Sequence, residues 1–214
     1  MNIGALLRGL LDLLAPLRCP GCDEVLEEQP GEEPPLDPFA QGFCCACAPL
    51  IEPYPGPEAL YEYGGPLAEA IKRLKYQGRL DTLPGLTRLV DRARADLVGE
   101  ADLVVPVPLF RSRRVARGFN QSALLVAPLA SALGVPLGRR ALTRVRDTAP
   151  QAQLDAEGRE RNVRGAFRAK PLDGERVLLF DDVHTTGATL GAAREALFEA
   201  GASEVITLSL AGKT

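Results

Sequence analysis

Over residues 59–214, short apolar runs alternate with longer stretches in which apolar side chains recur at helical spacing. The run "VLLF" at 177–180 is apolar at every position, which is typical of a strand covered on both faces, as in a parallel sheet. The expected elements are a strand, turn and helix within 60–79, strands at 103–105, 141–146, 175–183 and 203–211, and helices at 122–134 and 189–201. Strands that alternate with helices predict an α/β fold with a doubly wound, mostly parallel sheet.

Outside these elements, the chain has an N-terminal part and a polar segment near 147–158. Leucines crowd residues 1–18 at the spacing of an amphipathic helix, but Asp12 interrupts the run, which argues against a signal peptide. No stretch is long and apolar enough to span a bilayer, so we expect a cytoplasmic protein. The polar segment near 147–158 is expected to be an exposed lid. We therefore predict a small N-terminal module at 1–58 and a larger domain at 59–214.

Charge is distributed unevenly along the chain. The formal net charge is -3, but residues 19–71 contain eleven acidic side chains and no Lys or Arg. Residues 72–214 carry a net charge of +7. The larger part should therefore favour anionic ligands, whereas the acidic module is a poor candidate for direct contact with nucleic-acid phosphates.

Four of the five cysteines form two C-x2-C pairs. This spacing lets both thiolates of a pair reach one tetrahedral ion, and zinc is the expected metal. Cys45 is an alternative ligand to its neighbour in the second pair, and two disulfides are an alternative to a metal. The predicted structural zinc ligands are Cys19, Cys22, Cys44 and Cys47.

Basic side chains gather directly after the strand at 103–105. Arg111, Arg113 and Arg114 lie within a segment that also contains Arg117, at the carboxyl end of that strand. Guanidinium groups donate forked hydrogen bonds that fit phosphate oxygens, so all four are candidates for contacting a polyphosphate; a solvated basic loop is the alternative. Lys75 is either a ligand-binding residue or a charge at the end of a helix.

The segment "VLLFDDVHTTGATL" at 177–190 places two aspartates at the end of a buried strand, immediately before a turn and a helix start. Backbone N–H groups at a helix N-terminus can hold a phosphate, with help from threonine hydroxyls. Asp181 and Asp182 can instead accept hydrogen bonds from two sugar hydroxyls and can lie near a magnesium ion. The pattern therefore predicts a site for a ribose 5-phosphate.

This segment resembles the signature of type I phosphoribosyltransferases, which bind phosphoribosyl pyrophosphate (PRPP). Together with "CPGC", "CCAC", "VPVPLFRSRRVARGFNQS" and "RVRDTAPQAQLDAEGRERNVRGAF", the chain is similar to ComF-type competence proteins. The resemblance implies a zinc-ribbon module and a phosphoribosyltransferase domain that acts in uptake or processing of transforming DNA. It implies that Asp181 and Asp182 hold the ribose, that the segment after Val107 meets the pyrophosphate, and that the 5-phosphate is cradled by Thr185, Thr186, Gly187, Ala188 and Thr189.

Several functions stay open at this stage. One is an enzyme that transfers phosphoribose, with Mg²⁺ and arginines that neutralise the departing pyrophosphate and with Arg111, Arg113 and Arg114 as its catalytic residues. Another is a non-catalytic module that binds PRPP or single-stranded DNA and contacts proteins of the competence machinery. Nucleobase salvage is a third, although Thr185 stands where salvage enzymes often carry an acid. His184 is either a catalytic group or a turn residue. The acceptor is not specified by the sequence.

Overall fold

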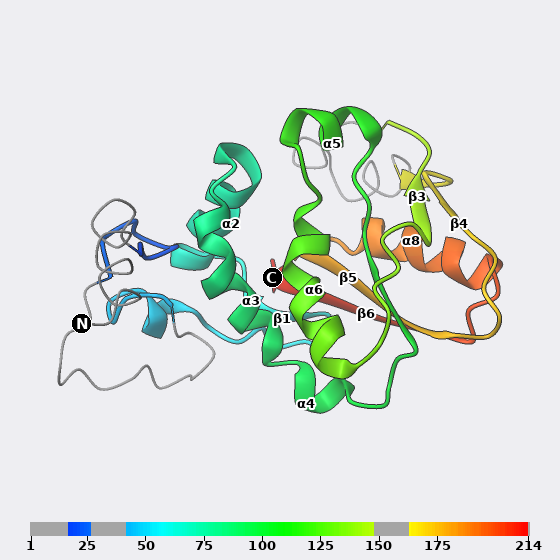
Figure 1. Ribbon diagram of the computed structural model, residues 1–214, viewed down its shortest axis with the longest axis horizontal. Helices are drawn as coiled ribbons and strands as arrows, with labels where there is room; N and C mark the ends of the chain where they lie inside the picture. The colour runs from blue at the N-terminus through cyan, green and yellow to red at the C-terminus, as the bar shows by residue number, and fades with distance from the viewer. Residues whose placement is uncertain (1–16, 27–41, 148–162, 214) are drawn as a thin grey trace, which may run out of the picture.

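The computed structural model describes residues 17–26, 42–147 and 163–213. The expected helix at 1–16, most of the acidic segment between the cysteine pairs and most of the expected lid lie outside these residues. Figure 1 shows the arrangement of the elements, which are η2 (Ala48–Leu50), β1 (Ala59–Glu62), α2 (Gly65–Gln77), η3 (Leu80–Thr82), α3 (Leu83–Asp91), α4 (Arg94–Leu97), β2 (Leu103–Pro106), α5 (Arg111–Arg117), α6 (Gln121–Leu133), β3 (Leu142–Arg144), β4 (Phe167–Ala169), β5 (Arg176–His184), α8 (Ala188–Glu199) and β6 (Glu204–Gly212).

The main sheet is parallel, as predicted, with the strand order β1-β6-β5-β2. Helices cover both faces: residues of α2, α3 and α6 pack with Leu178 and Phe180 of β5, and residues of α8 pack with Val177 and Leu179. This alternation along β5 is the pattern expected of a strand buried on both sides. The predicted doubly wound fold is therefore confirmed.

Two elements differ from expectation. The predicted strand around residues 141–146 does form, as β3, but it pairs antiparallel with β4 in a separate two-stranded sheet. The arginine-rich segment expected to be a loop is the helix α5. Its only large apolar side chain, Val115, is 73% exposed, so the helix lacks the apolar stripe by which sequence patterns reveal helices.

The segment around the cysteines packs against the larger domain. Cys19, Cys47 and Ile51 belong to the same buried apolar cluster as Leu67 and Leu74 of α2. The domain boundary at residue 58 stays a prediction, but the two parts share one core. Within the described part of the chain, no helix is both long and apolar enough to cross a membrane.

Candidate functional site

The site lies at the carboxyl end of the parallel sheet, where β5 extends beyond its neighbour β2. Pro106, the last residue of β2, pairs with Phe180, and β5 then continues to His184. Helix α6, the second helix after β2, covers one face of the sheet, and α8, which follows β5, covers the other. In open α/β sheets such a reversal leaves a crevice at the carboxyl ends of the strands, which is where ligands bind.

Asp181 and Asp182 lie in this crevice and are both buried. Asp181 Oδ1 accepts hydrogen bonds from Ser122 Oγ of α6 and from the Asp182 N–H, each at 2.9 Å. Burial raises the pKa of Asp181 to about 7, and the neighbouring charge of Asp182 adds to this increase. The pair therefore combines a carboxylate with a group that is partly protonated near neutral pH.

Lys75 of α2 completes the acidic end of the site. Its Nζ lies 2.5 Å from Asp182 Oδ2, and both side chains are largely buried. Burial alone would lower the pKa of Lys75, but the charge of Asp182 and its hydrogen bond outweigh this and raise the pKa above the ordinary value. Lys75 is therefore a site residue and not a solvated helix charge, and the sequence did not distinguish these two roles.

The turn after β5 leads directly into α8. Gly187 is the N-cap residue of this helix and has φ 76°, a left-handed conformation that favours glycine. A Cβ at this position would lie 3.2 Å from the ring of His184. Thr185, Thr186 and the first residues of α8 line a narrow depression next to Asp181. The helix N-terminus and the hydroxyls are thus placed together, as a phosphate site requires.

These two groups of residues meet in one cleft of about 390 Å³. Thr185 and Thr189 line it together with the two aspartates and Lys75. The opposite wall carries the basic side chains Arg113, Arg117 and Arg144.

The arginines of α5 divide between two cavities. Arg113 lines the cleft, whereas Arg111 and Arg114 line a neighbouring cavity and not the cleft. Arg117, one of the four expected phosphate-binding arginines, also lines the cleft, and Arg144 is a cleft residue that was missed as a candidate. Arg117 donates a hydrogen bond to Gln121 Oε1 at 2.5 Å, and Arg144 is a buried residue of β3. Arg144 is recognised as a candidate because it is a buried arginine beside a cleft, and the sequence pattern "ALTRVR" does not show that this arginine is buried.

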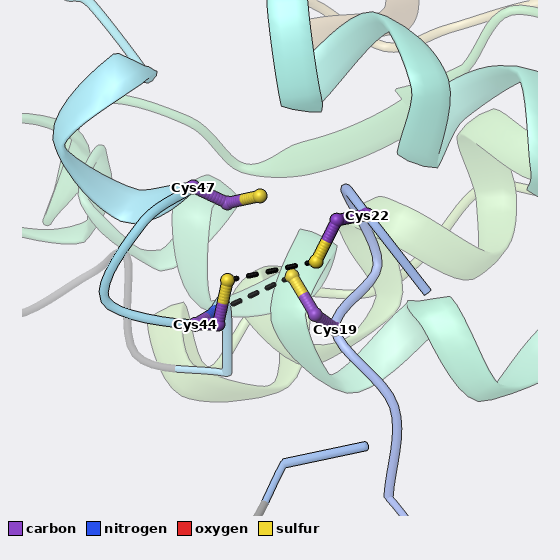
Figure 2. Close-up of side chains that lie close together, drawn as sticks. All are labelled: Cys19, Cys22, Cys44 and Cys47. Carbon is purple, nitrogen blue, oxygen red and sulfur yellow. Dashed lines mark hydrogen bonds between the residues drawn. The ribbon is translucent and has the colours of Figure 1, made fainter. Parts of the chain in front are cut away.

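The four predicted metal ligands come together beside α2. The Sγ atoms of Cys19, Cys22, Cys44 and Cys47 all lie within 4.8 Å of one another (Figure 2). The Sγ atoms of Cys22 and Cys44, one from each pair, are 3.6 Å apart. A tetrahedral Zn–S₄ site with Zn–S bonds of about 2.3 Å requires sulfur atoms about 3.8 Å apart. The arrangement therefore fits a tetrahedral metal ion.

The thiols have different surroundings. Burial would raise the pKa of Cys19, but backbone N–H groups that include that of Cys44 outweigh it and lower the pKa overall. The Cys44 N–H lies 3.3 Å from Cys19 Sγ, the kind of contact that stabilises a metal-bound thiolate. All five cysteines are free in this structure, and Cys45 is exposed and lies outside the cluster.

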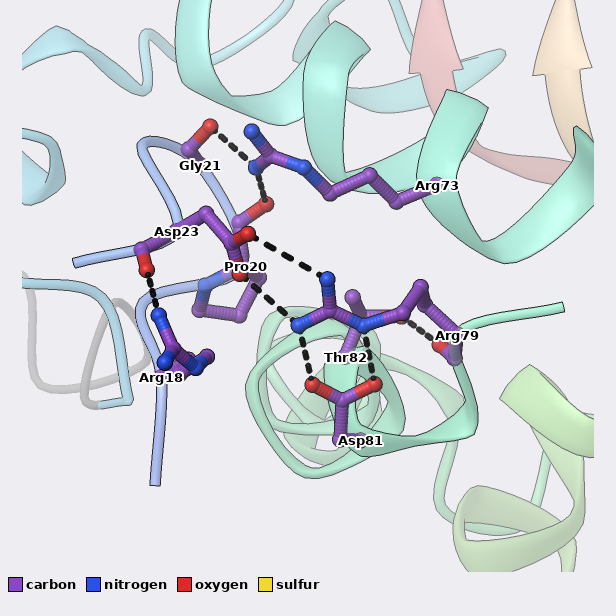
Figure 3. A network of polar contacts seen from close by, with 8 residues as sticks. All are labelled: Arg18, Pro20, Gly21, Asp23, Arg73, Arg79, Asp81 and Thr82. Carbon is purple, nitrogen blue, oxygen red and sulfur yellow. Dashed lines mark hydrogen bonds and ion pairs between the residues drawn. The ribbon is translucent and has the colours of Figure 1, made fainter. Parts of the chain in front are cut away.

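Polar contacts attach this cysteine cluster to the domain (Figure 3). Arg73 of α2 donates hydrogen bonds from Nη1 to the carbonyl oxygens of Pro20 and Gly21, the two residues between the first pair of cysteines. Arg79 Nη2 forms ion pairs at 2.7 Å with both Asp23 and Asp81. Helix α2 thus contacts the cysteine cluster through Arg73 and the acidic pair through Lys75.

Comparison with known proteins agrees with this geometry. Residues 120–214 match the family model described as phosphoribosyl transferase domain. A solved structure, purine phosphoribosyltransferase from Pyrococcus horikoshii, is 19% identical with a TM-score of 0.41, covering 59% of this chain and 73% of that one. The fold, the cleft and the family model define a phosphoribosyltransferase-type domain.

Relatives that align over more of the chain identify the family within this class of domain. The chain is 36% identical over 168 residues to DNA utilization protein YhgH of Salmonella typhi, covering 76% of this chain and 74% of the relative. It is 31% identical over 218 residues to Competence protein F of Haemophilus influenzae, covering 95% and 94%. The chain therefore belongs to the ComF family.

Proposed function

We propose that the cleft binds PRPP, and that the protein is a ComF-type phosphoribosyltransferase that acts in the uptake or processing of DNA. The observation that carries the proposal is the placement of two acidic side chains beside a helix N-terminus in one cleft. Asp181 and Asp182 would accept hydrogen bonds from the ribose hydroxyls, and residues 185–189 would hold the 5-phosphate. The names of the relatives in Salmonella typhi and Haemophilus influenzae support the link to DNA.

The pyrophosphate of PRPP would face the basic wall of the cleft. Arg113, Arg117 and Arg144 supply positive charge there, and a departing pyrophosphate needs such charge in the transition state. Bound magnesium would supply further neutralisation of that charge. Because Asp182 already pairs with Lys75, magnesium would be held mainly by the phosphates of the ligand, and Asp181 and Asp182 are the cleft carboxylates that could contribute to its binding. Arg111 and Arg114 do not line this cleft and have no part in this proposal.

We also propose that Cys19, Cys22, Cys44 and Cys47 hold one structural zinc ion. Four thiolates leave no open coordination position, so the ion would stabilise the fold and take no part in chemistry. Its effect would be to fix the module of residues 1–58 onto α2.

Calorimetric titration with PRPP and Mg²⁺ tests the binding part of the proposal. We expect the wild type to bind and Asp182→Asn to bind at least tenfold more weakly, because one ribose contact is lost and Lys75 loses its partner. The control, Asp173→Asn, removes an exposed carboxylate that precedes β5, at the end of the strand opposite to the cleft, and should bind as the wild type does. Absence of binding to the wild type would overturn the proposal.

Pyrophosphate release tests the enzymatic part separately. The protein is incubated with PRPP, Mg²⁺ and a series of acceptors that includes free nucleobases and single-stranded DNA, and released pyrophosphate is measured. Release that depends on an acceptor supports a transferase. Tight binding without release from any acceptor would reject the transferase and leave a PRPP-binding module.

A further inference from the structure

A second cavity of about 680 Å³ lies next to the cleft and is lined by residues from α5, α6 and the two-stranded sheet of β3 and β4. Its size is within the range of small-molecule binding sites. The two cavities share the wall formed by Pro108, Leu109 and Arg144. The cationic side chains that line the second cavity are Arg111, Arg114, Arg139, Arg140, Arg144 and Lys170.

Helix α5 separates the two cavities. Arg113 and Arg117, four residues apart, face the cleft, whereas Arg111 and Arg114, three residues apart, face the second cavity. Residues three or four apart lie on the same face of a helix, so each pair presents its charges to one side. The density of arginines in α5 is thereby explained by two sites and not by one.

The charges of the second cavity are not balanced by acids. Its described lining residues include no Asp or Glu, in contrast to the cleft, where Asp181 and Asp182 oppose the basic wall. Within the described part of the chain, Arg139, Arg140 and Lys170 form no ion pair with a carboxylate. Like charges gathered without counter-charges repel one another, and an anionic ligand removes this repulsion.

The remaining wall is apolar and carries an aromatic ring. Phe119, Leu109 and Leu124 line the cavity on the side of α6, and Phe119 is partly buried against the core. An aromatic face next to arginines is the combination that binds a base by stacking and its phosphate by charge. Inorganic phosphate would use only the second of these features.

We propose that this second cavity binds a nucleoside phosphate, with its phosphate on Arg139, Arg140 and the outer arginines of α5 and its base against Phe119. The ligand is either a free nucleotide or the phosphorylated end of a single strand. The position of this ligand beside PRPP rests on the proposed function, because the two cavities share a wall. The proposal that the second cavity binds a nucleoside phosphate rests only on the residues that line it.

The test uses the full-length protein in low salt with two variants of equal charge. Arg139→Gln combined with Arg140→Gln removes two charges from the cavity, and Arg94→Gln combined with Arg194→Gln removes two exposed charges, on α4 and α8, that line neither cavity. The probes are AMP, a short single-stranded oligonucleotide with and without a 5′-phosphate, and inorganic phosphate. Binding is measured by calorimetry, with PRPP binding and thermal stability measured on the same samples.

We expect AMP or the 5′-phosphorylated oligonucleotide to bind the wild type and the control alike, and the cavity variant at least tenfold more weakly. PRPP binding should be unchanged in both variants, and the cavity variant should be at least as stable as the control, because two like charges are removed from the cavity. Stronger binding of AMP than of the oligonucleotide assigns the site to free nucleotides, and a requirement for the 5′-phosphate on the oligonucleotide assigns it to a strand end. Equal losses in both variants, no binding of any nucleotide, or inorganic phosphate binding as tightly as AMP would each overturn the inference. If the wild type bound a nucleotide at this site but did not bind PRPP, the result would count against the proposed function and not against this site.

Discussion

Asp181 makes the stability of the protein depend on pH. Its pKa is raised to about 7 by burial and by Asp182, against an ordinary value of 3.8. Above pH 4 the folded protein therefore binds more protons at this position than the unfolded chain does, and stability falls as pH rises towards 7. A difference of about 3 pKa units at 1.36 kcal/mol each corresponds to at most about 4 kcal/mol above pH 7.

Asp181→Asn removes this cost and keeps the local hydrogen bonds, because the amide oxygen can still accept from Ser122 and from the Asp182 N–H. The free energy of unfolding of the variant should exceed that of the wild type, and the excess should grow by about 3 kcal/mol between pH 5 and pH 8. PRPP binding should weaken, so stability and function change in opposite directions.

The assay is urea unfolding at pH 5 and pH 8, followed by circular dichroism because the chain has no Trp. Asp173→Asn is the control and should show no pH-dependent difference from the wild type. An excess stability that is the same at both pH values, or a variant that is less stable at pH 8, would refute the reasoning.

Three further predictions concern the metal cluster and the phosphate turn. Metal removal by a chelator should lower the melting temperature, and Cys44→Ser should lose the bound zinc while Cys45→Ser keeps it; unchanged metal content in Cys44→Ser would contradict the assignment. Arg73→Met should lower the free energy of unfolding in urea by about 1 to 3 kcal/mol, because it removes charged hydrogen bonds to the turn between the first two cysteines. Lys72→Met removes an exposed charge from the same helix and is the control. An equal loss of stability in both variants would indicate a general effect of charge. Gly187→Ala should lower the free energy of unfolding by about 1 kcal/mol, because Gly187 has a positive φ, and should weaken PRPP binding. Gly191→Ala, at a position with open space in the same helix, should instead raise the free energy of unfolding by up to about 1 kcal/mol. A change of the same sign in both variants would contradict the strain argument.

Features that depend on neighbours in the chain were predictable from the sequence. The two acids directly follow the apolar run of β5 in the chain, so their place near the carboxyl end of that strand could be predicted. The end of helix α6 could be predicted from Gly134, its C-cap residue, which has φ 72°. The cysteine cluster was predictable for the same reason, since C-x2-C spacing constrains each pair by itself.

Features that depend on packing were not predictable. The ion pair between Lys75 and Asp182 joins residues more than 100 positions apart, and nothing in the local pattern of either one indicates it. The antiparallel pairing of β3 with β4 and the burial of Arg144 likewise arise from tertiary contacts. Helix α5 was missed because both of its faces carry arginines that line cavities, and neither face carries the apolar stripe that indicates a helix in a sequence.

Binding of PRPP and of its parts is the most direct measurement of whether the acidic pair and the phosphate turn act on one ligand. Calorimetric titrations of the wild type with PRPP, ribose 5-phosphate and pyrophosphate, each with Mg²⁺, compare the three affinities under one set of conditions. PRPP should bind at least tenfold more tightly than either part, and Asp182→Asn should weaken ribose 5-phosphate more than pyrophosphate. If pyrophosphate alone bound as tightly as PRPP, and ribose 5-phosphate did not bind, the cleft would be a general polyanion site and the proposed function would be wrong.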